Sequence, residues 1–79
     1  MIMQIDKTVD LKGLVCPFPW VKAKKALAKM EVGQILKVIV DHAPASENIP
    51  RYFEEEGQKI LSVDKIDGLD WQIIVKKGK

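Results

Sequence analysis

Residues 20–40 read WVKAKKALAKMEVGQILKVIV, a pattern that predicts a helix followed by a buried strand. Its first half repeats apolar residues at helical spacing, which predicts an amphipathic helix over residues 20–30. The apolar positions are Trp20, Ala23, Ala26, Leu27 and Met30, and the opposite face carries Lys22, Lys25 and Lys29. Gly33 is expected to end the helix, and the β-branched run of residues 35–40 has the length of a buried central strand.

A first strand is expected before this helix. Residues 3–11 alternate, with Val9 and Leu11 on one side and Asp10 on the other, before Lys12-Gly13 turns the chain. A strand, a helix and a second strand in this order imply a right-handed crossover between two parallel strands.

A second helix and a hairpin are expected to follow. The helix has its stop at Gly57, while Pro50 restricts the first turn and is expected to delay the regular helix. Its apolar positions are Ala45, Ile49, Tyr52 and Phe53. Asp67-Gly68 predicts a two-residue turn between a strand at residues 60–66 and the last strand. That last strand alternates Trp71, Ile73 and Val75 with Gln72 and Lys76.

The order β, α, β, α, β, β therefore predicts a two-layer α/β sandwich. We expect a mixed four-stranded sheet with both helices on one face. The chain has 79 residues, of which 47% are hydrophobic and 30% charged, which is typical of a globular protein. We interpret residues 1–79 as a single domain with a small core.

Charge is unevenly distributed along the chain. The net charge is +2, but residues 1–40 carry seven lysines against three acids, and residues 41–70 carry eight acids against three bases. This total is too small for strong nonspecific binding to nucleic acid. A partner that docks on the amino-terminal part is therefore expected to be acidic there.

Cys16 is the only cysteine, so no disulfide can form within the chain. A reducing cytoplasm fits this composition. No apolar run approaches the roughly 20 residues of a membrane span, and the start of the chain lacks the pattern of a secretory signal. We therefore expect a cytoplasmic protein.

The segment Gly13-Leu14-Val15-Cys16-Pro17-Phe18-Pro19-Trp20 joins the first strand to the first helix. Pro17 favours an extended Cys16, and Pro19 suits the first helical position, which makes Phe18 the expected N-cap. Phe18 has no side-chain acceptor, so the free N–H groups of the first turn need another partner, either water or an anion. A Cys16 thiolate is one such anion, because cysteines at helix N-termini have pKa values lowered from about 8.5 to between about 3.5 and 7.5. The alternative is that Cys16 is simply a small buried residue.

The run from Val9 to Pro19 resembles the opening motif of the TusA/SirA-like sulfurtransferase family, whose signature is Cys-Pro-x-Pro. Gly33, Gly57, the terminal hairpin and Asp41 with the pair Ile49-Pro50 also fit, so the resemblance covers nearly the whole chain. It implies a fold similar to the carboxy-terminal domain of bacterial translation initiation factor 3, with sheet order 1-2-4-3. The segment Asp41-His42-Ala43-Pro44 departs from the Asp-x-Pro that is usual in the family, and Asn48 stands where Asp is common, which leaves partner identity open.

The resemblance further implies that Cys16 carries sulfur as a persulfide. The donor would be a cysteine desulfurase or a rhodanese-like protein, and the acceptor a DsrE-like or other thiol protein, in a relay such as tRNA 2-thiolation or sulfur metabolism. Pro17, Phe18 and Pro19 are the supporting motif. Such a carrier needs no cofactor and no metal, and the sequence offers no second cysteine or Gly-rich phosphate loop.

Several other residues have competing interpretations. Trp20, Lys22, Lys24 and Lys25 are candidates for partner docking, although Trp20 is more readily a core residue. We assign no catalytic role to His42, and we expect Phe18 to be either exposed beside the thiol or packed under the turn. Two functions of other classes stay open. One is a noncatalytic regulatory or protein-interaction module, and the other is an RNA-binding module that uses the lysine face of the first helix.

Overall fold

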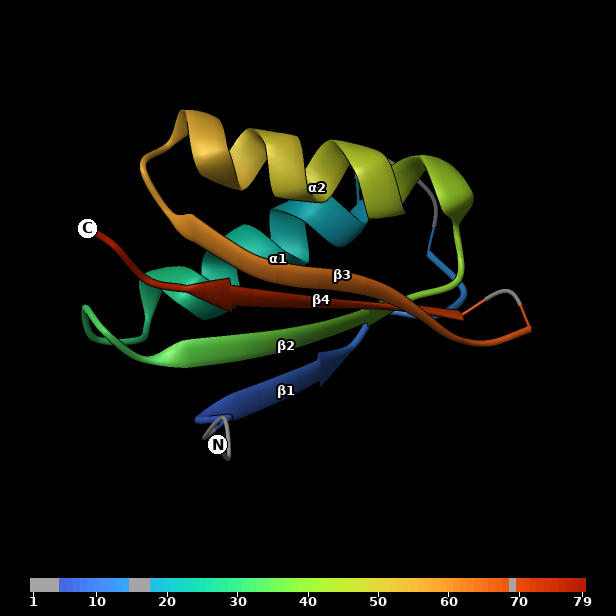
Figure 1. Cartoon of the computed structure of the whole chain (residues 1–79), viewed down its shortest axis with the longest axis horizontal. Coiled ribbons are helices and arrows are strands. Elements are labelled where there is room, and N and C mark those ends of the chain that lie inside the picture. Colours follow the sequence, from blue (N-terminus) through green and yellow to red (C-terminus); the bar gives the residue numbers. More distant parts are fainter. Residues whose placement is uncertain (1–4, 15–17, 69) are drawn as a thin grey trace.

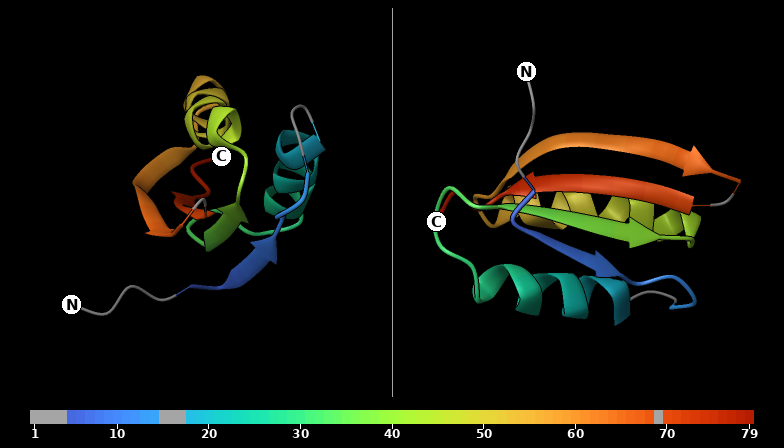
Figure 2. Two further views of the ribbon diagram at one scale, coloured as in Figure 1. Left: turned by 90° about the vertical axis from the view of Figure 1, so that its right-hand side faces the viewer. Right: turned by 90° about the horizontal axis from the view of Figure 1, so that it is seen from below.

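The computed structural model describes residues 5–14, 18–68 and 70–79, and it shows four strands and two helices in these parts of the chain. In chain order they are β1 (Lys7–Asp10), α1 (Phe18–Ala28), β2 (Ile35–Val40), α2 (Ala43–Glu55), β3 (Lys59–Asp67) and β4 (Asp70–Lys76). The strands form one sheet in the order β1-β2-β4-β3 (Figure 1). Both helices lie on the same face of this sheet (Figure 2). The predicted two-layer sandwich, its sheet order and its element order are confirmed.

The sheet is mixed because β2 pairs differently with its two neighbours. It runs parallel to β1, with Val9 opposite Val38, and antiparallel to β4, with Val38 opposite Ile73. The strand β3 closes the other side as an antiparallel partner of β4. The crossover through α1 thus joins two neighbouring parallel strands, as predicted.

The core lies between the helices and the sheet. Alternate residues of β2 are fully buried against the helices, as expected for a central strand. The buried cluster consists of Leu11, Ala23, Ala26, Leu27, Met30, Leu36, Val38, Val40, Ala45, Ile49, Phe53, Ile73 and Val75. All the apolar positions predicted for the first helix belong to it except Trp20, which is half-buried and packs against it.

Several element boundaries differ from the sequence prediction. The strand β1 begins at Lys7 rather than at residue 3, and residues 1–4 lie outside the described part of the chain. Leu11 stands beyond the strand end, although it is buried and its N–H donates to Ile39 O at 2.7 Å. The hairpin turn falls one residue later than predicted, because Asp67 still pairs with Asp70. The turn lies one residue later because the pairing of β3 with β4 sets the register of the hairpin. This register shifts at two places in β3, between Ile60 and Ser62 and between Lys65 and Asp67.

The helix α1 begins at Phe18 and ends at Ala28, so Phe18 is its first residue and not its N-cap. Pro19 is then the second helical residue, where its missing N–H is as harmless as at the first. At the other end, Lys77 Nζ donates to Ala28 O at 3.2 Å and to Met30 O at 2.6 Å. A lysine at this end satisfies carbonyls that the helix leaves free, and the helix ends before Gly33.

The helix α2 starts at Ala43, so the prediction that Pro50 delays it was wrong. Pro44 lies in its first turn, where proline is favoured, and Pro50 lies inside the helix. Pro50 removes one main-chain hydrogen bond, but Ile49 and Phe53 on the same helix are buried in the core. Burial of this face therefore outweighs the local preference of proline.

No helix in the described residues is both long and apolar enough to cross a membrane.

Candidate functional site

The Cys-Pro-Phe-Pro motif spans the end of the loop after β1 and the first two residues of α1. Residues 15–17, which include Cys16 and Pro17, lie outside the described residues, and the flanks of the site end at Leu14 and begin again at Phe18. The carboxyl ends of the parallel strands β1 and β2 meet at the same edge of the sheet, and this loop leaves from that edge (Figure 1). Ligand sites of open α/β sheets commonly lie at such an edge.

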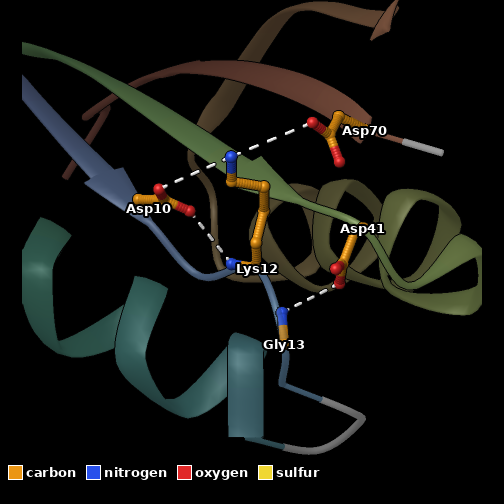
Figure 3. Close-up of polar contacts among 5 residues, drawn as sticks. All are labelled: Asp10, Lys12, Gly13, Asp41 and Asp70. Atoms are coloured by element: carbon orange, nitrogen blue, oxygen red, sulfur yellow. Dashed lines mark hydrogen bonds and ion pairs between the residues drawn. The ribbon is translucent and has the colours of Figure 1, made fainter. Parts of the chain in front are cut away.

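Asp41, the first residue after β2, holds the entrance of the loop. The N–H of Gly13 donates to Asp41 Oδ1 at 3.0 Å, across 28 positions of sequence (Figure 3). Gly13 adopts a φ of +88°, which a residue with a side chain rarely tolerates. The N–H of Leu14 then donates to Leu11 O at 3.3 Å and closes a turn. The chain therefore approaches Cys16 in a turn that is fixed by a carboxylate and a glycine.

Lys12 spans the strand ends beside this turn. Its N–H donates to Asp10 Oδ1 at 3.1 Å, and its Nζ lies 3.9 Å from carboxylate oxygens of both Asp10 and Asp70 (Figure 3). These ion pairs are long and solvent-exposed, so each contributes little to stability. Their effect is to direct Lys12 across the edge of the sheet.

On the exit side of the loop, Phe18 and Pro19 face opposite ways. The side chain of Phe18 is 59% exposed, whereas Pro19 is buried. Phe18 is therefore exposed rather than packed under the turn. An exposed aromatic ring two residues from Cys16 in sequence is available to a partner protein.

Trp20 anchors α1 to α2. Its ring centroid lies 5.1 Å from that of Tyr52 and 4.8 Å from that of Phe53 in an edge-to-face arrangement. Lys24 Nζ lies 5.8 Å from the Trp20 ring centroid and 3.3 Å from Glu56 Oε2. Trp20 and Lys24 are thus engaged with α2.

Lys22 and Lys25 lie on another side of α1. Both are exposed and line a groove that α1 forms with β1. The four residues predicted for partner docking are therefore not one patch: two face α2 and two face β1. The lysine face predicted for the first helix is confirmed, since Lys22, Lys25 and Lys29 are all exposed.

His42 precedes α2 and acts through its main chain. Its carbonyl oxygen accepts hydrogen bonds from the N–H groups of Ala45 at 2.9 Å and Ser46 at 3.4 Å, while its side chain makes no capping hydrogen bond. The residue therefore starts the helix through its main chain.

Sequence reasoning noted Asp41 as part of a motif but missed its contact with Gly13. The signal that could have found it is its position directly after β2, because parallel neighbours bring their carboxyl-terminal loops together.

Three comparisons with known proteins relate this chain to one family. The family model described as "Sulfurtransferase TusA" matches residues 7–77. A protein of Archaeoglobus fulgidus is 41% identical over 75 residues, which cover 95% of this chain and 85% of that protein. A protein of Escherichia coli is 41% identical over 74 residues, covering 94% and 99% respectively. Their names are "Putative sulfur carrier protein" and "Putative sulfur carrier protein TsuB".

The similarity extends to three dimensions. The crystal structure of a SirA-like protein from Desulfitobacterium hafniense superposes with a TM-score of 0.82 at 31% identity, covering 92% of this chain and 99% of that one. The family model spans most of the chain, and the chain matches most of the length of both relatives. The chain therefore belongs to the TusA sulfurtransferase family, whose members here bear the names of sulfur carriers.

Proposed function

We propose that this protein carries sulfane sulfur as a persulfide on Cys16 and passes it to a partner protein. One observation carries the proposal. The chain belongs to a family of sulfur carriers, and it contains a single cysteine. Because Cys16 is the only thiol in this chain, a carrier that holds sulfur on a thiol must use it. Cys16 is also the first residue of the Cys-Pro-Phe-Pro motif.

The transfer is a pair of thiol exchanges without net oxidation. The Cys16 thiolate attacks the outer sulfur of a donor persulfide, a new S–S bond forms on Cys16, and the old S–S bond breaks. The electron pair of the broken bond leaves with the donor sulfur as a thiolate, which then takes a proton from solvent. A partner thiolate repeats the step on the outer sulfur of the Cys16 persulfide and restores the Cys16 thiolate.

The flanks of the loop support this chemistry. Asp41 fixes the entrance through Gly13, and α1 begins two residues after Cys16 with its positive end toward the loop sequence. The main-chain N–H groups of Phe18 and Trp20 belong to the first turn of a helix that has no Ser, Thr, Asp or Asn before it in residues 15–18. An anionic sulfur there is stabilised, and a terminal persulfide is a stronger acid than a thiol.

The partners proposed are those that the resemblance to the family implies. A cysteine desulfurase or a rhodanese-like protein supplies the sulfur, and a DsrE-like or other thiol protein accepts it, in tRNA 2-thiolation or another branch of sulfur metabolism in the cytoplasm. The docking residues that we propose are Phe18, whose ring is exposed within the motif, and Lys22 and Lys25, which line the groove between α1 and β1. Trp20 and Lys24 contribute by fixing α1 against α2.

The experiment is intact mass spectrometry under nonreducing conditions, after incubation with a cysteine desulfurase and cysteine. We expect wild type to gain the mass of one sulfur atom, which a reductant removes, and Cys16→Ser to gain none. Asp64→Ala, an exposed change on β3, is the matched control and gains sulfur like wild type. If wild type gains no sulfur from any donor and Cys16 resists alkylation in the folded protein, the proposal fails and a noncatalytic interaction module takes its place.

A further inference from the structure

A groove of about 600 Å³ runs between β1 and α1. Apolar side chains of both elements and of the loop line its floor, and lysines stand along its rim. The apolar residues are Val9, Leu11, Leu14 and Ala26, and the charged residues are Lys7, Asp10, Lys12, Lys22, Lys25 and Lys29. The groove thus reaches from the start of β1 to a residue two positions before Cys16.

One wall of the groove is a free sheet edge. The sheet order places β1 at the border of the sheet, where it pairs with β2 and with no other strand among the described residues (Figure 2). Alternate main-chain N–H and C=O groups of a strand point to its two sides, so those directed away from β2 are available to a further strand. An extended chain that enters the groove can pair with them.

The charge of the groove is strongly positive. Five lysines and one aspartate line it. Lys12 forms ion pairs with Asp10 and Asp70, but Lys7, Lys22, Lys25 and Lys29 form none within the described parts of the chain. Four uncompensated ammonium groups around an apolar floor favour an occupant that carries both carboxylates and apolar side chains.

We propose that this groove binds an extended acidic segment of a partner protein, which pairs with β1 as a fifth strand. In a strand, successive side chains point to opposite faces. The side chains of the segment that point to the helix-covered face of the sheet are therefore the ones that enter the groove. Among these, apolar side chains pack on Val9 and Leu11, and acidic side chains reach Lys7 and the lysines of α1. The identity of the partner rests on the function proposed above: it is a protein that gives sulfur to Cys16 or accepts sulfur from it.

The composition of the groove favours a peptide over RNA. None of the residues that line it is aromatic, so nucleotide bases have no ring to stack on. The free edge also offers main-chain donors and acceptors in the repeat that a peptide strand matches.

The binding test uses Cys16→Ser protein, so that binding does not depend on sulfur chemistry. The probe is a fluorescein-labelled ten-residue peptide in which every second residue is Thr and the residues between them alternate Val and Glu, so that Val and Glu share one face of the strand. Its binding is followed by fluorescence anisotropy at fixed ionic strength. Three comparison probes are the same peptide with Lys in place of Glu, the Glu and Val peptide with a central proline, and a ten-nucleotide oligouridine. We expect the Glu and Val peptide to bind most tightly and the proline to weaken it, because proline cannot donate to a strand ladder.

Charge reversal locates the site. Lys25→Glu with Lys29→Glu changes the groove, and Lys59→Glu with Lys76→Glu is the matched control on the exposed far part of the sheet. The groove variant is expected to weaken the peptide about tenfold, since each reversal removes an attraction and adds a repulsion, whereas the control changes affinity less than about twofold. Amide resonances of Lys7–Asp10 are expected to shift on binding, and those of Lys59–Asp67 to stay in place.

Two results overturn the proposal. Equal binding to the groove and control variants refutes the groove, and tighter binding of oligouridine or of the proline peptide refutes strand addition. The outcome is separate from sulfur loading. Peptide binding without sulfur on wild-type Cys16 leaves the groove standing without the proposed function, and sulfur loading without peptide binding leaves the proposed function standing without the groove.

Discussion

The contact of Asp41 with Gly13 gives the sharpest prediction about the loop. We consider Asp41→Ala, which removes the carboxylate that accepts the Gly13 N–H at 3.0 Å. A hydrogen bond to a charged group contributes about 1.5–3 kcal/mol when buried. Because this contact is exposed, we discount it to about 1 kcal/mol of unfolding free energy, which corresponds to a Tm lower by about 4–8 °C for a chain of this size.

Asp41→Asn separates charge from geometry in the same position. It keeps an oxygen where the N–H points but loses the charge, so we expect about half of the loss in stability. The assay is urea unfolding followed by tryptophan fluorescence, with the midpoints compared at constant m-value. Asp64→Ala, which is exposed on β3, is the control and is expected to stay within about 0.5 kcal/mol of wild type.

The same variants test whether the contact matters for function. If the turn before Cys16 positions the thiol, sulfur loading of Asp41→Ala is slower than that of wild type but reaches the same final mass. An Asp41→Ala protein with wild-type stability and a wild-type loading rate would refute the reasoning that this contact holds the loop.

The remaining predictions concern the core, a turn and the thiol. Phe53→Ala is expected to cost about 3–5 kcal/mol in urea unfolding, because the side chain is 1% exposed, whereas Phe18→Ala, at 59% exposed, is expected to stay within about 0.5 kcal/mol. Gly13→Ala is expected to lower the free energy of unfolding by about 1–2 kcal/mol through its φ of +88°, although its Cβ meets open space; an unchanged urea midpoint would contradict this. The rate of alkylation of Cys16 against pH is expected to have its midpoint below about 8.5, and a midpoint at or above that value would contradict stabilisation of the thiolate.

Periodicity in the sequence was sufficient to predict the type and the buried residues of the elements that have one buried face. The helix α1 and the strand β2 carry clear patterns, so their types and buried residues are as predicted. The boundaries of α1 differ because they depend on contacts from elsewhere, such as Lys77 at its carboxyl end. The sheet order came from resemblance to a family, since local patterns do not specify which strands are neighbours.

Local rules were wrong where tertiary packing opposed them. Pro50 is a reason to start a helix late, yet Ile49 and Phe53 bury the face of α2 on both sides of it. In the hairpin, Asp67-Gly68 is a strong turn signal, but the pairing of Asp67 with Asp70 moves the turn by one residue.

The site also has features that the sequence predicts and features that only the structure reveals. The Cys-Pro-Phe-Pro motif is readable because it is a continuous stretch of sequence. The contact of Asp41 with Gly13 and the groove between β1 and α1 each join distant segments, so no local pattern reveals them. The sequence also grouped Trp20 with Lys22, Lys24 and Lys25, whereas the structure divides them between two sides of α1.

The central claim is that Cys16 carries the sulfur. The most direct measurement is the intact mass of wild type and Cys16→Ser after incubation with a cysteine desulfurase and cysteine, followed by addition of a reductant. We expect one added sulfur atom on wild type that the reductant removes, and none on Cys16→Ser. Equal sulfur on both proteins, or none on wild type with any donor, would contradict it.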